Sequence, residues 1–283
     1  MILFKKITDL NKWLNTARKN RQAIGFVPTM GALHHGHMSL IQQANTHTQI
    51  SVCSIFVNPT QFNERADYDQ YSKPVEADIE KLYSANCQVL FLPDEHEIYP
   101  NGKTGLKNYD IGQLENILEG KSRPGHFQGV CQVVDRLLDI VDPDSLFMGQ
   151  KDFQQTQVVK RLIEVTGKKT ILKVCPIIRE ADGLAMSSRN VRLSEQERKD
   201  AAQIYAGLNY IKENCNNISF DELKNTVLNN WKAIPTFKPD YLEFCDVANL
   251  KPVNNIKDAE QVVVLAAIIV GNVRLIDNVI LNQ

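Results

Sequence analysis

Runs of apolar residues alternate with helical patterns through the first two thirds of the chain. Five short apolar runs are typical of buried strands, and they span residues 23–27, 50–57, 88–92, 145–148 and 171–175. Between the later runs, residues 128–141 and 156–165 place their apolar side chains at helical spacing. This alternation predicts an α/β domain in which helices cover both faces of a parallel sheet.

The pattern changes near residue 176. Ser194-Glu195-Gln196-Glu197 and Ser219-Phe220-Asp221-Glu222 have the spacing of capping boxes and predict two helix starts. Strand patterns follow at 241–247, 261–270 and 273–281, and the Gly-Asn pair at 271–272 predicts a hairpin. We therefore expect one domain over residues 1–176 and a smaller α+β domain over residues 177–283.

Composition and charge narrow the class of protein. Among 283 residues, 43% are hydrophobic and 23% charged, and the net charge is -1, as in an ordinary globular protein without a nucleic-acid partner. The six cysteines contain no C-x-x-C pair, which indicates a reducing, cytoplasmic location. Neither a signal sequence nor an apolar run long enough to span a membrane is evident, so no membrane contact is expected.

The most informative segment directly follows the predicted strand at 23–27. Residues 28–37 are typical of a glycine-containing turn and a helix start, with His34 and His37 three residues apart. The backbone N–H groups at a helix start bind phosphate, and imidazoles stabilise charge on a reacting phosphoryl group. An ordinary polar helix start is the alternative, whereas zinc would need further ligands. His35 is expected to point outward.

Polar segments also follow two other predicted strands. The carboxamides of Asn58, Gln61 and Asn63 can satisfy the hydroxyl and carboxylate groups of a small substrate. Lys151 follows Gly149 at another predicted helix start, where a lysine suits a phosphate. Ligands of α/β sheets bind beyond the carboxyl ends of the strands, so we expect the site there. A polar turn and a solvated helix start are the alternatives.

Two loops carry cationic side chains. Residues 182–190 include Ser187, Ser188 and Arg189, which suit triphosphate oxygens, and the Asp-Gly turn indicates a loop that closes on ligand. Residues 120–127 form a basic Gly/Pro segment for which a plain surface loop is the favoured interpretation. No Walker A sequence occurs, so ATP binding through a P-loop is not expected.

Five segments occur in the order found in the pantothenate synthetase (pantoate–β-alanine ligase) family. They are PTMGALHHGH, SIFVNPTQF, LEGKSRPGHFQGV, GQKDFQQ and ADGLAMSSRN, and the chain resembles the family over residues 27–190. The H-x-G-H element alone would indicate only the wider nucleotidyltransferase superfamily. The resemblance implies a Rossmann-like doubly wound domain and a smaller α+β domain closing over the site, in a homodimer.

The resemblance also implies a two-step reaction. The carboxylate of pantoate attacks the α-phosphorus of ATP, giving pantoyl adenylate and pyrophosphate, and the amine of β-alanine then displaces AMP to give pantothenate. The first step joins two anions, so clustered positive charge and N–H donors should stabilise its transition state. Mg²⁺ is expected with ATP, held mostly by phosphates and water, with Asp78 as the one candidate protein ligand.

Roles for individual residues follow from the same resemblance. Catalysis is expected from His37 as the proton donor, and from His34, Lys151 and Arg189 near the phosphates. Pantoate is expected at Gln61, Gln155 and Asn58, and β-alanine at Gln61. Asp152 is expected on the ribose, and the backbone of Ile178 on the adenine. The expected ATP-binding residues are Met30, Gly31, Ala32, Leu33, His34, His35, Gly36, His37, Gly149, Gln150, Lys151, Asp152, Ile178, Met186, Ser187, Ser188 and Arg189.

Two other functions stay open at this point. A nucleotidyltransferase that leaves AMP on its product would share His34 and His37 but would not explain Gln61 and Gln155 together. A non-catalytic nucleotide-sensing module would bind ATP without pantoate-dependent release of pyrophosphate.

Overall fold

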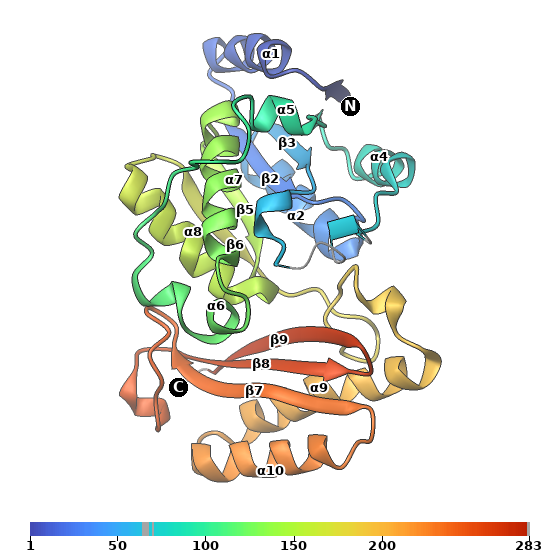
Figure 1. The fold of residues 1–283 in the computed structure, drawn as a ribbon, viewed down its shortest axis with the longest axis vertical. Coiled ribbons are helices and arrows are strands. Elements are labelled where there is room, and N and C mark those ends of the chain that lie inside the picture. The colour runs from blue at the N-terminus through green and yellow to red at the C-terminus, as the bar shows by residue number, and fades with distance from the viewer. Residues whose placement is uncertain (64–67, 70, 282–283) are drawn as a thin grey trace. The chain divides into compact units, whose positions relative to one another are not determined.

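A computed structural model of the chain describes residues 1–63, 68, 69 and 71–281 (Figure 1). The chain forms two compact units, one of Met1–Gly149 with Gln154–Pro176 and one of Gln150–Phe153 with Ile177–Gln283. The segment Gln150–Phe153, which the sequence analysis places in the first domain, thus packs with the second unit. Within the described residues, no helix combines the length and the apolar character that crossing a membrane requires.

The first unit is built on a six-stranded parallel sheet of order β1-β4-β3-β2-β5-β6. Its strands are β1 (Ile2–Phe4), β2 (Ile24–Thr29), β3 (Ile50–Ile55), β4 (Val89–Phe91), β5 (Ser145–Gly149) and β6 (Ile171–Cys175). The chain proceeds outward from β2 to β3 and β4, then returns to the other side of β2 for β5 and β6. This reversal between β2 and β5 is the place where doubly wound sheets bind ligands. The predicted α/β fold is confirmed.

Helices cover both faces of this sheet. Alternate strand side chains enter two cores: Phe26 and Val52 pack with α1 (Ile7–Lys19), α7 (His126–Val141) and α8 (Phe153–Thr166), whereas Val27 and Cys53 pack with α2 (His35–His47) and α4 (Val75–Ser84). The helices and short 3-10 turns of the unit are α1 (Ile7–Lys19), α2 (His35–His47), η1 (Pro59–Gln61), α4 (Val75–Ser84), α5 (Glu95–Ile98), η2 (Gly112–Glu115), α6 (Leu118–Ser122), α7 (His126–Val141) and α8 (Phe153–Thr166). The helices predicted at 128–141 and 156–165 are confirmed and begin two to three residues earlier.

The second unit contains an antiparallel sheet of order β7-β8-β9. Its elements are η3 (Gln150–Asp152), η4 (Asn190–Arg192), α9 (Glu195–Asn214), α10 (Phe220–Lys232), β7 (Phe237–Asp246), η5 (Ile256–Asp258), β8 (Val262–Val270) and β9 (Val273–Leu281). The predicted hairpin is present, because Val270 pairs with Val273. Ser194 and Ser219 cap α9 and α10 as predicted. The strand predicted at 241–247 begins earlier, at Phe237.

Candidate active site

The turn after β2 is held by a buried carboxylate. Ala32 has a left-handed backbone (φ 50°), which costs energy for a residue other than glycine. Asp78 of α4, 0% exposed, accepts the N–H groups of Ala32 at 2.8 Å and Leu33 at 2.7 Å. Lys81 donates to the Leu33 carbonyl at 2.7 Å. These bonds fix the turn and the direction in which α2 leaves it.

The same contacts bear on the predicted magnesium ligand. Both oxygens of Asp78 already accept backbone hydrogen bonds of the turn. The described part of the chain contains no group of three or more His, Cys, Asp or Glu side chains that could hold a metal ion. These residues therefore do not fit a Mg²⁺ ion held by the protein alone.

His34 and His37 form a reciprocal cap at the start of α2. The Nδ1 atom of His34 accepts from Gly36 N at 3.2 Å, and Nδ1 of His37 accepts from His34 N at 3.2 Å. The ring centroids are 4.1 Å apart. A nitrogen that accepts a hydrogen bond carries no proton, so each neutral ring carries its proton on Nε2. Both imidazoles are thereby held in the same tautomer, while His35 is exposed as expected.

The structure corrects the expected use of the backbone in this segment. The N–H groups of Ala32 and Leu33 donate to Asp78, and those of His34 and Gly36 donate to imidazoles. Backbone donors removed from water need partners, and here the protein supplies them internally. These four backbone N–H groups are therefore already paired within the protein.

A chain of hydrogen bonds orients Gln61 in η1. Tyr99 Oη donates to Asn58 Oδ1 at 2.7 Å, and Asn58 Nδ2 donates to Gln61 Oε1 at 3.1 Å. Among the described residues, the amide nitrogen of Gln61 donates to the thioether of Met30, at 3.1 Å, which is a weak acceptor. Gln61 therefore presents N–H donors. Asn58 is 1% exposed and also donates to the Gly129 carbonyl, so its observed contacts orient Gln61.

The basic segment before α7 is more than a surface loop, contrary to the favoured sequence interpretation. His126 is buried and its Nδ1 donates to the Gln61 carbonyl at 2.8 Å, while Arg123 Nη1 donates to His126 Nε2 at 3.1 Å. Gly129 lets α7 approach η1 closely, because a Cβ atom there would lie 2.4 Å from the Thr60 carbonyl oxygen. This segment fixes the backbone of Gln61.

Two neighbouring glutamines on α8 have different roles. The buried Gln154 amide accepts from Glu119 N at 2.9 Å and donates to the Leu114 and Ile117 carbonyls. Gln155 is half-buried and makes no side-chain hydrogen bond to another described residue. Gln154 thus stabilises the preceding loop by hydrogen bonds, whereas the Gln155 amide can bind a substrate.

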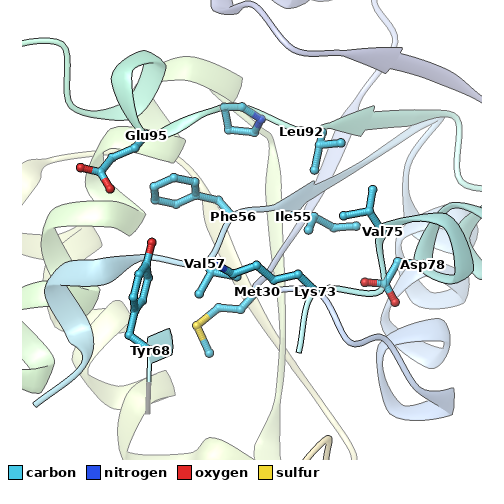
Figure 2. A pocket seen from close by; sticks show the side chains of 12 residues that line it. Met30, Ile55, Phe56, Val57, Tyr68, Lys73, Val75, Asp78, Leu92 and Glu95 are labelled. Atoms are coloured by element: carbon cyan, nitrogen blue, oxygen red, sulfur yellow. The ribbon is translucent and has the colours of Figure 1, made fainter. Parts of the chain in front are cut away.

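A pocket of about 190 Å³ opens beside the turn after β2 (Figure 2). Met30 and Gly31 form part of its wall, and Lys73 lies 4.8 Å from the ring centroid of Tyr68. Its remaining lining residues are mostly apolar: Ile55, Phe56, Val57, Val75, Asp78, Leu92, Pro93 and Glu95. Met30 is the link to Gln61, since its sulfur accepts the hydrogen bond from the glutamine amide.

In the second unit, β9 holds the segment that contains Lys151. Asn278 Nδ2 donates to the carbonyls of Gln150 and Lys151, both at 3.0 Å, and Asn278 Oδ1 accepts from Gln150 Nε2 at 3.0 Å. The Lys151 ammonium lies 4.0 Å from Asp152. The side chain of Gln150 is therefore used within the protein, while Lys151 is fixed through its backbone.

A turn closed by a short antiparallel bridge leads into the loop of residues 186–189, which are Met186, Ser187, Ser188 and Arg189. Arg179 pairs with Ala185 in an antiparallel bridge, and Met186 N donates to the Ile178 carbonyl at 3.0 Å. Ser187 Oγ accepts from Arg189 N at 3.2 Å. Residues 186–189 and Ile178 are all half-buried, so their side chains retain access to solvent.

An ion pair between the half-buried Arg179 and the buried Asp277 anchors this turn. The Arg179 guanidinium binds Asp277 through two contacts of 2.6 and 3.0 Å and lies 3.8 Å from the centroid of the Tyr205 ring. Burial raises the pKa of Asp277 above its usual value, and the Arg179 charge opposes that rise. The sequence analysis missed Arg179, Asp277 and Asn278. The available signal was an Asp-Asn pair inside an apolar strand pattern.

Proteins of known family resemble this chain over nearly its whole length. A family model described as pantoate-beta-alanine ligase matches residues 2–280. The pantothenate synthetase of Porphyromonas gingivalis is 40% identical over 279 residues, covering 99% of each chain. The pantothenate synthetase structure from Thermus thermophilus has a TM-score of 0.92 at 36% identity, covering 99% of each chain. The pantoate-beta-alanine ligase structure from Francisella tularensis, complexed with beta-gamma ATP and beta-alanine, has a TM-score of 0.81 at 39% identity, covering 99% of this chain and 97% of that one.

Proposed function

The chain belongs to the pantoate–β-alanine ligase family, and from this premise we propose how its residues carry out the reaction. It is an enzyme that condenses pantoate with β-alanine in an ATP-dependent reaction. We propose that the reaction passes through pantoyl adenylate, with release of pyrophosphate and then AMP. The observation that carries this proposal is the reciprocal cap of His34 and His37 beyond β2.

The two imidazoles serve the first step. Held as Nε2–H tautomers, His34 and His37 donate hydrogen bonds to phosphate oxygens as negative charge shifts toward the leaving pyrophosphate. His37, expected from the resemblance to be the proton donor, acts in this proposal as a hydrogen-bond donor, because a neutral imidazole does not give up its Nε2 proton. Since the cap fixes both rings before substrate binds, little reorganisation is needed during the reaction.

Gln61 and Gln155 select the acid. The Gln61 amide presents N–H donors, which suit the carboxylate and hydroxyl oxygens of pantoate and the carboxylate of β-alanine. Gln155 has an amide without an internal partner among the described residues. Asn58 acts chiefly by orienting Gln61, and a direct contact with pantoate stays a prediction.

The resemblance supplies further nucleotide-binding residues. Lys151 and Arg189 neutralise phosphate charge, assisted by the hydroxyls of Ser187 and Ser188. Asp152 binds the ribose and the backbone of Ile178 contacts the adenine. Met186, Gly149 and Gln150 shape the same segments, Gln150 through its bond to Asn278.

Mg²⁺ accompanies ATP in this proposal. Because Asp78 is committed to the turn after β2, phosphate oxygens and water would supply most of the coordination. When bound, the ion would neutralise phosphate charge.

We also propose a homodimer in a reducing, cytoplasmic compartment. The edge strand β6 exposes Ile171 by 57% and Val174 by 44%, which suits a subunit contact. All six cysteines are free and buried, as suits a reducing compartment. Light scattering of the unaltered chain beside Val174→Lys tests the dimer, and an unaltered chain that elutes as a monomer would contradict it.

A coupled AMP-release assay tests the mechanism. With ATP and pantoate alone, pyrophosphate is expected in an amount equal to the enzyme, and AMP release should require β-alanine. If labelled AMP stays on the final product, the chain is instead a nucleotidyltransferase. If ATP binds but pantoate triggers no pyrophosphate, it is a nucleotide sensor.

A further inference from the structure

Two adjacent polar residues interrupt the apolar pattern of β9. Val273, Leu275, Val279 and Leu281 alternate along the face that packs on the core of the second unit. Asp277 lies in register with them, so its carboxylate occupies a core-facing position. Asn278 follows on the opposite face and is 1% exposed. A buried carboxylate and a buried amide are costly unless all their hydrogen bonds are made, so their partners matter.

The partner of Asp277 is Arg179, which lies in the turn of residues 178–186 that precedes Ser187. Arg179 binds the carboxylate with two hydrogen bonds, and its Nη1 also donates to the Gly183 carbonyl at 3.0 Å. The guanidinium therefore joins the base and the tip of this turn. Arg179 directly follows Ile178 in the chain and pairs with Ala185 across the turn.

The partner of Asn278 is the segment that contains Lys151. Its amide makes three hydrogen bonds of 3.0 Å, two of them to the backbone carbonyls of Gln150 and Lys151. Two consecutive residues of one strand thus anchor two segments that lie far apart in the sequence. Both segments carry cationic side chains assigned to phosphate under the proposed function.

We propose that Asp277 and Asn278 are positioning residues that set the spacing between Lys151 and the 178–189 segment for ATP. The inference rests on the proposed function, in which these segments bind the nucleotide. Neither residue needs to touch ATP. A displacement of about 1 Å in a binding group can lower reactivity about 100-fold, so loss of either anchor should weaken ATP use selectively.

Asn278→Ala tests the first anchor. Steady-state pyrophosphate release is measured at saturating β-alanine, with ATP varied at saturating pantoate and with pantoate varied at saturating ATP. We expect kcat/KM for ATP to fall about 10- to 100-fold, while the KM for pantoate stays close to that of the unaltered chain. Asp240→Asn is the matched control, because it removes the charge of a 2.8 Å ion pair between Asp240 of β7 and Arg274, which lies on the same strand as Asn278.

The second anchor needs a variant that folds. Asp277→Asn would leave the half-buried guanidinium of Arg179 without its full partner, so both partners are replaced in Arg179→Met/Asp277→Leu. Apolar replacement of a whole buried ion pair commonly preserves stability. We expect this double variant to melt near the unaltered chain and to lose affinity for a non-hydrolysable ATP analogue by about 10-fold or more in calorimetry.

The outcomes separate this inference from the proposed function. If both variants bind the analogue and use ATP as the unaltered chain does, the positioning role is refuted while the ligase mechanism stands. If the KM for pantoate rises as much as that for ATP, the residues act on the fold in general and the inference also fails. If the unaltered chain releases no pyrophosphate with pantoate, the proposed mechanism fails, and calorimetry still decides the positioning role.

Discussion

At the scale of single residues, one pair of histidines combines a structural task with the chemical task that we propose for it. The Nδ1 atoms of His34 and His37 accept backbone hydrogen bonds at the start of α2, which fixes the tautomer of each ring. A helix normally uses serine and glutamate for this reciprocal cap. Histidine at both positions keeps the cap and places two Nε2–H donors at the carboxyl end of β2.

His37→Gln separates these tasks. Glutamine is a usual partner at this position of a capping box, so α2 should stay capped and the melting temperature should change little. Loss of the imidazole donor should slow adenylate formation about 10²- to 10³-fold. Single-turnover pyrophosphate release measures the effect, with the exposed neighbour His35→Gln as the control. A rate near that of the unaltered chain would remove His37 from the chemistry.

Gln61 provides a second test at this scale. Gln61→Ala should raise the KM for pantoate more than the KM for ATP, because the lost N–H donors face the acid in our mechanism. Tyr99→Phe removes the hydrogen bond that orients Asn58, and through it Gln61, and should produce a weaker effect of the same kind. An effect confined to ATP would show that Gln61 belongs to another part of the site.

At the scale of elements, function depends on short connections that neighbouring elements hold in place. The turn after β2 is fixed by Asp78 of α4, η1 is fixed by His126 of α7, and the 178–186 turn is fixed by Asp277 of β9. Each connection lies far in sequence from the element that anchors it. Rigid anchoring of loops to helices and strands holds reacting groups in position.

Gly183→Ala tests the anchored turn between residues 178 and 186. Gly183 has a φ of 91°, and a Cβ atom there would lie 2.4 Å from the Tyr205 ring that stacks on Arg179. We expect a loss of about 1–3 kcal/mol in the free energy of unfolding, with weaker ATP use. Gly102→Ala is the control, since its φ is 80° but no atom lies within 4 Å of the added Cβ. Equal losses in urea melts of both variants would show that only backbone strain matters.

At the scale of the whole molecule, free cysteine side chains are buried in both units. Burial raises the pKa of Cys87 to about 11 and the pKa of Cys131 and Cys245 to about 12. The thiolate is the reactive form, so at pH 8 these side chains should be inert while the chain is folded. Because these pKa values are higher in the folded chain than in the unfolded chain, the free energy of unfolding depends on pH.

The sign of this linkage follows from the raised pKa values. Below about pH 8.5 thiols are protonated in both states, and their contribution to stability is fully present. As the pH rises toward 11–12, unfolded thiols ionise first and the contribution is lost. We expect the melting temperature to fall over this range, with a shallower fall for Cys131→Ala. Rapid alkylation of all six thiols in the folded chain at pH 8 would contradict this account.

The sequence by itself determines the elements whose signals are local. Buried strand runs, the helical stripe of α7 and the serine caps of α9 and α10 depend on neighbouring residues, so the α/β order of the first unit could be predicted. The three-residue strand β1 could not, because only pairing with β4 makes it a strand. The motif segments likewise identify the family, because the order of residue types along the chain can be compared without a structure.

Only the tertiary structure decided how these segments are held and which of their polar atoms make hydrogen bonds within the protein. Asp78, predicted as a metal ligand, satisfies a turn 45 residues away in sequence, and Asn58 serves Gln61. Gln150–Phe153 joins the second unit because Asn278 binds its backbone. Hydrogen bonds across such sequence separations depend on where the fold brings side chains, and that position has no local signature in the chain.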